Sequence, residues 1–121
     1  MRHDIRKSVW DAMEACRAIW EFADGLTLET YLANRRDRRA IERELEILGE
    51  ALNRIDEADP SFRNYLPEMG RAIGMRNRLA HGYDRVSDTA VWAAAKENIP
   101  IMHGKLAAWL EKNGQEQGTA P

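Results

Sequence analysis

The sequence predicts an all-α fold, an up-and-down four-helix bundle whose last helix is kinked or split near Pro100. Apolar residues recur every three or four positions through most of the 121 residues, as they do on the buried faces of amphipathic helices. No segment shows the two-residue alternation of a β-strand, and short connections separate the helical segments. These observations favour helices that run up and down beside their neighbours in the chain.

The first helix is expected over residues 4–23, where one apolar face repeats at helical spacing. Asp24-Gly25 supplies the signal that ends it. Thr27 is a candidate N-cap for a short turn of helix, which leads into a charged run over residues 35–39.

A second, longer helix follows the charged run and ends at Asp59-Pro60. Its apolar stripe consists of Ile41, Leu45, Leu48, Leu52 and Ile55. Pro67 is expected in the first turn of a third helix, which carries a thin apolar stripe and has Gly82 as its termination signal.

The fourth helix is expected to have Asp88 as its cap and to carry an apolar stripe from Trp92 to Leu110. Pro100 lies inside this helix and should therefore kink or break it. We expect a single helical domain over residues 1–112, followed by a flexible polar tail over residues 113–121.

The composition of the chain narrows the classes of protein to which it can belong. The formal net charge is −2, so attraction to a polyanion must come from local clusters of basic residues. Cys16 is the only cysteine and the three histidines are far apart in the sequence, a pattern that is not typical of a metal site. No apolar stretch approaches the roughly 20 residues of a membrane span. We therefore expect a cytoplasmic protein with no metal, no cofactor and no membrane partner.

Residues 75–83 are the segment where polar, proton-active side chains interrupt the helical pattern. Asn77 and His81 share one face of an ideal helix, whereas Arg76 and His81 point roughly 140° apart. Three arrangements can join them: Arg76 reaches round the helix, the helix unwinds near Gly82, or a second chain completes the site. We favour the third together with the second.

The same three residues suit the cleavage of RNA without a metal, because the ribose 2′-hydroxyl beside the scissile phosphate supplies the nucleophile. His81 can serve as general base or acid near neutral pH. Arg76 can stabilise the phosphorane oxygens, and Asn77 can orient either partner. The alternative is structural: His81 satisfies a helix C-terminus and Arg76 lies solvated on a charged face. Spacing alone leaves both interpretations open.

The pattern Arg76-x4-His81-x-Tyr83 resembles the signature of the HEPN superfamily, and more narrowly that of its HepT toxins, with Asn77 in the polar place after the arginine. The resemblance extends from about residue 4 to residue 110. Three stretches carry it: residues 46–51, residues 75–83, and Val91-Trp92 followed by Ile99-Pro100.

This resemblance implies a function for the whole chain. It implies a HEPN-like bundle that forms a homodimer and acts as a metal-independent endoribonuclease, the toxin of a type VII-like toxin–antitoxin pair. The implied catalytic residues are Arg76, Asn77 and His81. The implied antitoxin is a minimal nucleotidyltransferase (MNT) that silences the toxin by AMPylation of Tyr83, which adds bulk and negative charge beside the catalytic pair. The alternative is a non-catalytic helical binding partner of a nucleotidyltransferase.

Further charged residues are candidates for supporting roles. Glu46 and Glu50 lie one turn apart on the second helix, with Gly49 between them allowing a neighbouring backbone to come close, and they can hold Arg76 or His81 in place. The candidates for contact with the RNA backbone are Arg35, Arg36, Arg39 and Arg78. For both groups the simpler interpretation is a solvated or ion-paired surface. The sequence leaves open whether the RNA is a transfer RNA or a messenger RNA.

Overall fold

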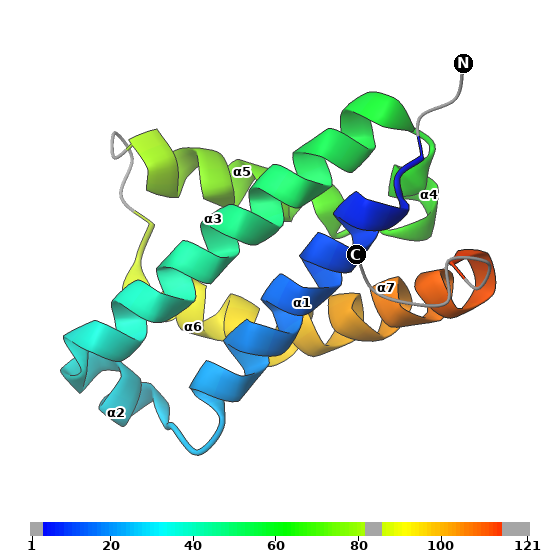
Figure 1. Ribbon diagram of the computed structural model, residues 1–121. Coiled ribbons are helices and arrows are strands. Elements are labelled where there is room, and N and C mark those ends of the chain that lie inside the picture. Colours follow the sequence, from blue (N-terminus) through cyan, green and yellow to red (C-terminus); the bar gives the residue numbers. More distant parts are fainter. Residues whose placement is uncertain (1–3, 82–85, 115–121) are drawn as a thin grey trace.

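The computed structural model describes residues 4–81 and 86–114, and within them it contains helices and no strand (Figure 1). The long helices are α1 (Arg6–Ala23), α3 (Arg35–Ala58) and α5 (Met69–His81). The last helical run consists of α6 (Asp88–Ala93), a π-helical turn η1 (Ala94–Asn98) and α7 (Ile99–Asn113). Two short helices are α2 (Leu28–Ala33) and α4 (Phe62–Tyr65). The predicted all-α class is confirmed.

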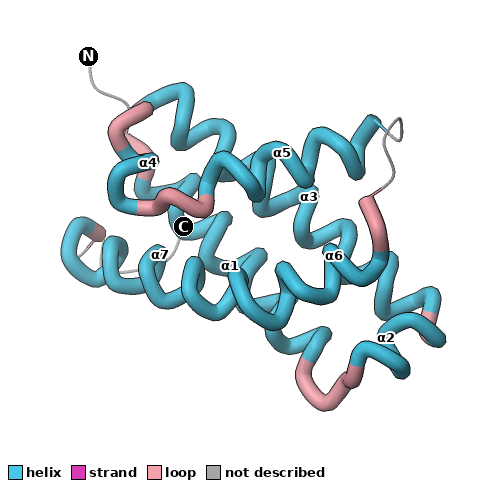
Figure 2. Tube along the Cα trace, turned by 180° about the vertical axis from the view of Figure 1, so that it is seen from behind, coloured by secondary structure: helices cyan, strands magenta, loops and turns pink. Residues whose placement is uncertain are grey.

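The long helices form an up-and-down bundle with α1 and α3 at its centre (Figures 1 and 2). Helix α3 packs against α1 on one side and α5 on the other, and α1 also packs against α7. The core between them is apolar, with its largest fully buried side chains contributed by Tyr31, Ile19, Ile41, Leu48, Leu52, Ile55, Leu66, Met69, Ile99, Met102, Leu106 and Val9. None of the helices in the described ranges is long and apolar enough to cross a membrane.

Two side chains with reactive or polar atoms lie inside this core. Cys16 is fully buried, and burial raises the pKa of its thiol to about 12. The thiol therefore stays protonated and inert at neutral pH. Tyr31 is also fully buried and packs against Trp92, with ring centroids 5.1 Å apart, and burial raises the pKa of its hydroxyl.

Most helix ends are where the sequence predicts them. Gly25, at φ +81°, follows α1 in the left-handed conformation that glycine adopts without strain. Thr27 forms a capping box with Thr30 at the start of α2. Three details differ. The cap of α6 is Ser87, whose hydroxyl accepts from the Ala90 N–H at 3.0 Å, so Asp88 is the first residue of the helix. Pro67, expected in the first turn of the third helix, lies before α5, and the charged run over residues 35–39 forms the first turns of α3 instead of preceding it. The short helix α4 was not predicted.

The predicted break near Pro100 is confirmed as a π-helical turn directly before it. The Ile99 N–H donates to the Ala94 carbonyl, one residue further back than in an α-helix. Proline has no N–H to donate and its ring crowds the carbonyl of the preceding turn, so a wider turn here accommodates Pro100 without ending the helix. Most of the predicted tail, residues 115–121, lies outside the described residues.

Helices α3 and α5 come unusually close at Gly49. A Cβ atom placed on Gly49 would lie 2.2 Å from the Cβ and 2.6 Å from the Cγ of Arg76, and 3.4 Å from the Ala72 carbonyl oxygen. No ordinary side chain fits this space, because both Arg76 atoms belong to the stiff root of the side chain. The glycine therefore sets the separation of the two helices.

We predict that Gly49→Ala lowers the free energy of unfolding by about 1–3 kcal/mol, because α5 must move away from α3 to admit the methyl group. The matched control is Gly104→Ala on α7, where an added Cβ meets no atom within 4 Å. That control should gain about 0.5–1 kcal/mol from helix propensity. Urea unfolding followed by circular dichroism measures both. A Gly49→Ala protein as stable as Gly104→Ala would contradict the close approach.

Candidate active site

Helix α5 carries all three predicted catalytic residues, and it is α-helical through His81. Gly82, where the sequence indicated unwinding, and Tyr83, the predicted site of AMPylation, lie outside the described residues. Asn77 and His81 are exposed and, four residues apart, fall on one face of the helix. Arg76 lies on another face, because side chains five residues apart on a regular helix point roughly 140° away from each other.

The side chain of Arg76 is held at both its root and its tip. Its root packs over Gly49 of α3. At its tip, Nη1 donates to Oδ1 of Asn77 at 3.0 Å and Nη2 lies 3.5 Å from Oε2 of Glu50. The Nε atom is buried and has no hydrogen-bond partner among the described residues. The guanidinium is therefore oriented but only partly satisfied, and 30% of the side chain remains exposed.

The two glutamates predicted to support the site make different contacts. Glu50 forms the ion pair with Arg76, and its side chain is 40% exposed. Glu46 instead pairs with Arg43 on its own helix at 3.1 Å. The structure thus brings Arg76, Asn77 and Glu50 together, whereas the contact made by Glu46 lies within α3. Supporting roles in chemistry remain predictions for both.

The face of α5 that carries Asn77 and His81 also carries two glycines, of which Gly70 is covered by the side chain of Arg63. Gly70, Gly74, Asn77 and His81 follow one another at helical spacing along this face. A Cβ placed on Gly74 would meet nothing within 4 Å, so packing within the chain does not require a glycine there. A glycine in the middle of a helix lowers the stability of the helix. The contacts within one chain give no reason for a glycine at position 74.

The arginines predicted to contact RNA divide into two groups. Arg39 pairs with Glu42 at 3.3 Å. Arg35, Arg36 and Arg78 are exposed and make no ion pair within the described part of the chain. Their positive charge is therefore not neutralised locally, although the whole chain carries a formal net charge of −2. In residues 4–81 and 86–114, no three His, Cys, Asp or Glu side chains gather into a group that would hold a metal ion.

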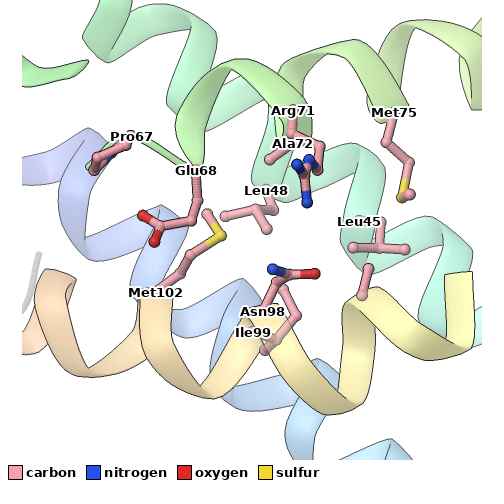
Figure 3. Close-up of a pocket in the computed structure, with 11 residues that line it drawn as sticks. Leu45, Leu48, Pro67, Glu68, Arg71, Ala72, Met75, Asn98, Ile99 and Met102 are labelled. Atoms are coloured by element: carbon pink, nitrogen blue, oxygen red, sulfur yellow. The ribbon is translucent and has the colours of Figure 1, made fainter. Parts of the chain in front are cut away.

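A cavity of about 330 Å³ between α3, α5, η1 and α7 was missed by the sequence analysis (Figure 3). Its polar lining residues are Glu68, Arg71 and Asn98. They come from two segments separated by some 30 residues, so sequence spacing gives no sign that they meet. Asn98 itself carries no signal, because it follows two other polar residues, Lys96 and Glu97.

Comparisons with known proteins assign the chain to a family. The model of the ribonuclease HepT-like family matches residues 12–108. "Probable ribonuclease HepT" of Thermococcus cleftensis is 33% identical over 108 residues, covering 88% of this chain and 96% of the relative. A protein of Methanocaldococcus jannaschii named "Putative RNase MJ1380" is 29% identical over 101 residues, covering 82% of this chain and 90% of the relative.

No solved structure matches the chain. The family model nevertheless spans α3, α5 and most of the last helical run, and therefore includes the segment with Arg76, Asn77 and His81. The chain belongs to the ribonuclease HepT-like family of the HEPN superfamily.

Proposed function

We propose that this chain is a metal-independent endoribonuclease and the toxin of a toxin–antitoxin pair. Membership of a family whose relatives are named as ribonucleases supports the reaction class. The observation that carries the proposal is the position of Arg76, whose guanidinium is oriented by Glu50 and Asn77 while 30% of the side chain stays exposed. A guanidinium held in this way offers directed charge to a phosphate.

In the proposed reaction, the ribose 2′-oxygen attacks the adjacent phosphorus and the bond to the 5′-oxygen breaks. The products are a 2′,3′-cyclic phosphate and a 5′-hydroxyl. His81 takes the proton from the 2′-hydroxyl and, once protonated, gives it to the leaving 5′-oxygen. Arg76 stabilises the negative charge that develops on the phosphorane oxygens, and Asn77 holds Arg76 in position.

The active form in this proposal is a homodimer in which Arg76 of one chain works with His81 of a second. Two features of α5 support this arrangement. Arg76 and His81 diverge on a single regular helix. Gly74 leaves the face that carries Asn77 and His81 open to close approach by another helix. A twofold axis beside this face would place both residue types in one groove.

We predict that His81→Ala lowers the rate of RNA cleavage at least about 100-fold, because it removes the proton acceptor. The assay incubates the pure protein with total RNA in EDTA and follows the products on a gel. His103→Ala is the matched control, since His103 packs beside Trp20 on the far helices and takes no part in the proposed site. If His81→Ala cuts RNA as fast as the parent, the catalytic proposal fails and the non-catalytic binding partner becomes the better interpretation.

The shared site makes a separate prediction. Arg76→Ala and His81→Ala should each be inactive alone, yet their mixed dimers should contain one intact site. Equal amounts unfolded and refolded together should therefore recover about a quarter of the parent activity. The double variant Arg76→Ala/His81→Ala, refolded with either single variant, is the control and should recover nothing. A mixture that stays inactive would show that each site draws both residues from one chain.

The proposed partner is an MNT-type antitoxin that transfers AMP to Tyr83, as the family resemblance implies. We predict that incubation with ATP and an MNT-type nucleotidyltransferase antitoxin adds the mass of one or more AMP groups and stops cleavage. Tyr83→Phe should gain no mass and remain active in its presence. Tyr65→Phe is the control and should be modified like the parent. Undiminished modification of Tyr83→Phe would place the acceptor elsewhere.

A further inference from the structure

The cavity between α3, α5 and the last helical run has the mixed lining of a ligand site. Its walls are apolar: Leu45 and Leu48 of α3, Met75 of α5, and Ile99 and Met102 of α7. Figure 3 shows the side chain of Arg71 entering from α5 and that of Asn98 rising toward it from the opposite helix. A volume of about 330 Å³ lies at the lower end of the range of small-molecule sites.

The polar groups of this cavity are not satisfied by the protein. Arg71 and Asn98 make no side-chain hydrogen bond or ion pair among the described residues. Glu68 lies 3.5 Å from Nζ of Lys105 through Oε2, whereas its Oε1 is buried without a hydrogen-bond partner in the described part of the chain. A buried carboxylate oxygen left unpaired costs free energy, so a rotation of the Glu68 carboxylate that turns this oxygen toward a donor in the cavity is favourable.

The cavity adjoins the proposed active site through α5. Met75 lines the cavity, and the next residue is Arg76. Arg71 lies five residues before Arg76, which is about 7.5 Å along the helix axis and roughly 140° around it, so the two side chains leave α5 on different sides. An RNA strand whose phosphate contacts Arg76 must therefore pass over α5 for a neighbouring base to enter the cavity.

We propose that this cavity is a base pocket that receives one purine of the RNA substrate. The proposal rests on the proposed ribonuclease function. Apolar walls of Leu, Ile and Met side chains can pack against the faces of a base, and the edges of purines carry N–H donors as well as acceptors. Glu68 accepts from a base N–H, while Arg71 and Asn98 donate to the acceptors of the same base. Two fused rings fill more of the roughly 330 Å³ than a single pyrimidine ring does, and for this reason we assign the cavity to a purine.

The test uses the methionines of the full-length chain as reporters. Protein labelled with 13C at the methionine methyl groups is titrated with the 3′-monophosphates of guanosine, adenosine, cytidine and uridine, and with ribose 5-phosphate. The purine nucleotides should shift the Met75 and Met102 signals and leave those of Met13 and Met69, which do not line the cavity, unchanged. Arg71→Ala and Asn98→Ala should each weaken purine binding roughly tenfold. Arg54→Ala, an exposed arginine on α3 that pairs with Asp11, should bind as the parent does.

The outcomes separate this proposal from the proposed function. His81→Ala should bind purines normally although it no longer cuts RNA. If the parent cuts RNA but purines leave Met75 and Met102 unshifted, the base pocket is overturned and the ribonuclease stands. Ribose 5-phosphate or pyrimidine nucleotides that bind as tightly as purines would also overturn it. If purines bind but RNA is never cut, the pocket stands and the ribonuclease fails.

Discussion

The contact between Gly49 and Arg76 is the constraint on which both the candidate active site and the neighbouring cavity depend. The missing Cβ of Gly49 lets the root of Arg76 lie directly on α3. This fixes where the guanidinium leaves the interface and places it beside Glu50 and Asn77. The same helix separation sets Leu45 and Leu48 opposite Met75 across the cavity. One absent methyl group therefore positions a charge on one side of α5 and an apolar wall on the other.

Ion pairs, more than composition, decide where the surface of this protein carries uncompensated charge. Near the start of α3, three arginines form ion pairs: Arg38 with Asp88, Arg39 with Glu42, and Arg43 with Glu46. Much of the positive charge of this basic run is therefore neutralised. Arg35, Arg36 and Arg78 keep their charge. An acidic chain can thus present local positive charge to a polyanion, and the strength of such an attraction falls with salt.

The sequence was sufficient to predict the helices and part of the candidate active site. Amphipathic stripes such as that of Ile41, Leu45 and Leu48 predicted the long helices, and Pro100 predicted the break in the last one. Gly49 was expected to allow a close approach, and the one-turn spacing of Glu46 and Glu50 indicated a shared face. Which of the two reaches Arg76 depends on the rotation of α5 against α3, a tertiary quantity that sequence periodicity does not contain. The cavity could not be predicted for the same reason, because its polar groups come together only when the helices pack.

The π-helical turn before Pro100 has a consequence for how a polar residue reaches the interior. A turn that holds one extra residue shifts the rotational register of everything before it relative to everything after it. The buried face of this helical run consists of five residues, two up to and within the π-helical turn and three after it: Val91, Ala95, Ile99, Met102 and Leu106. The surplus position in this insertion lets Asn98 face the cavity without displacing an apolar neighbour. Deleting one residue from this turn would restore a plain α-helix and bring the Pro100 ring against the carbonyl of the preceding turn.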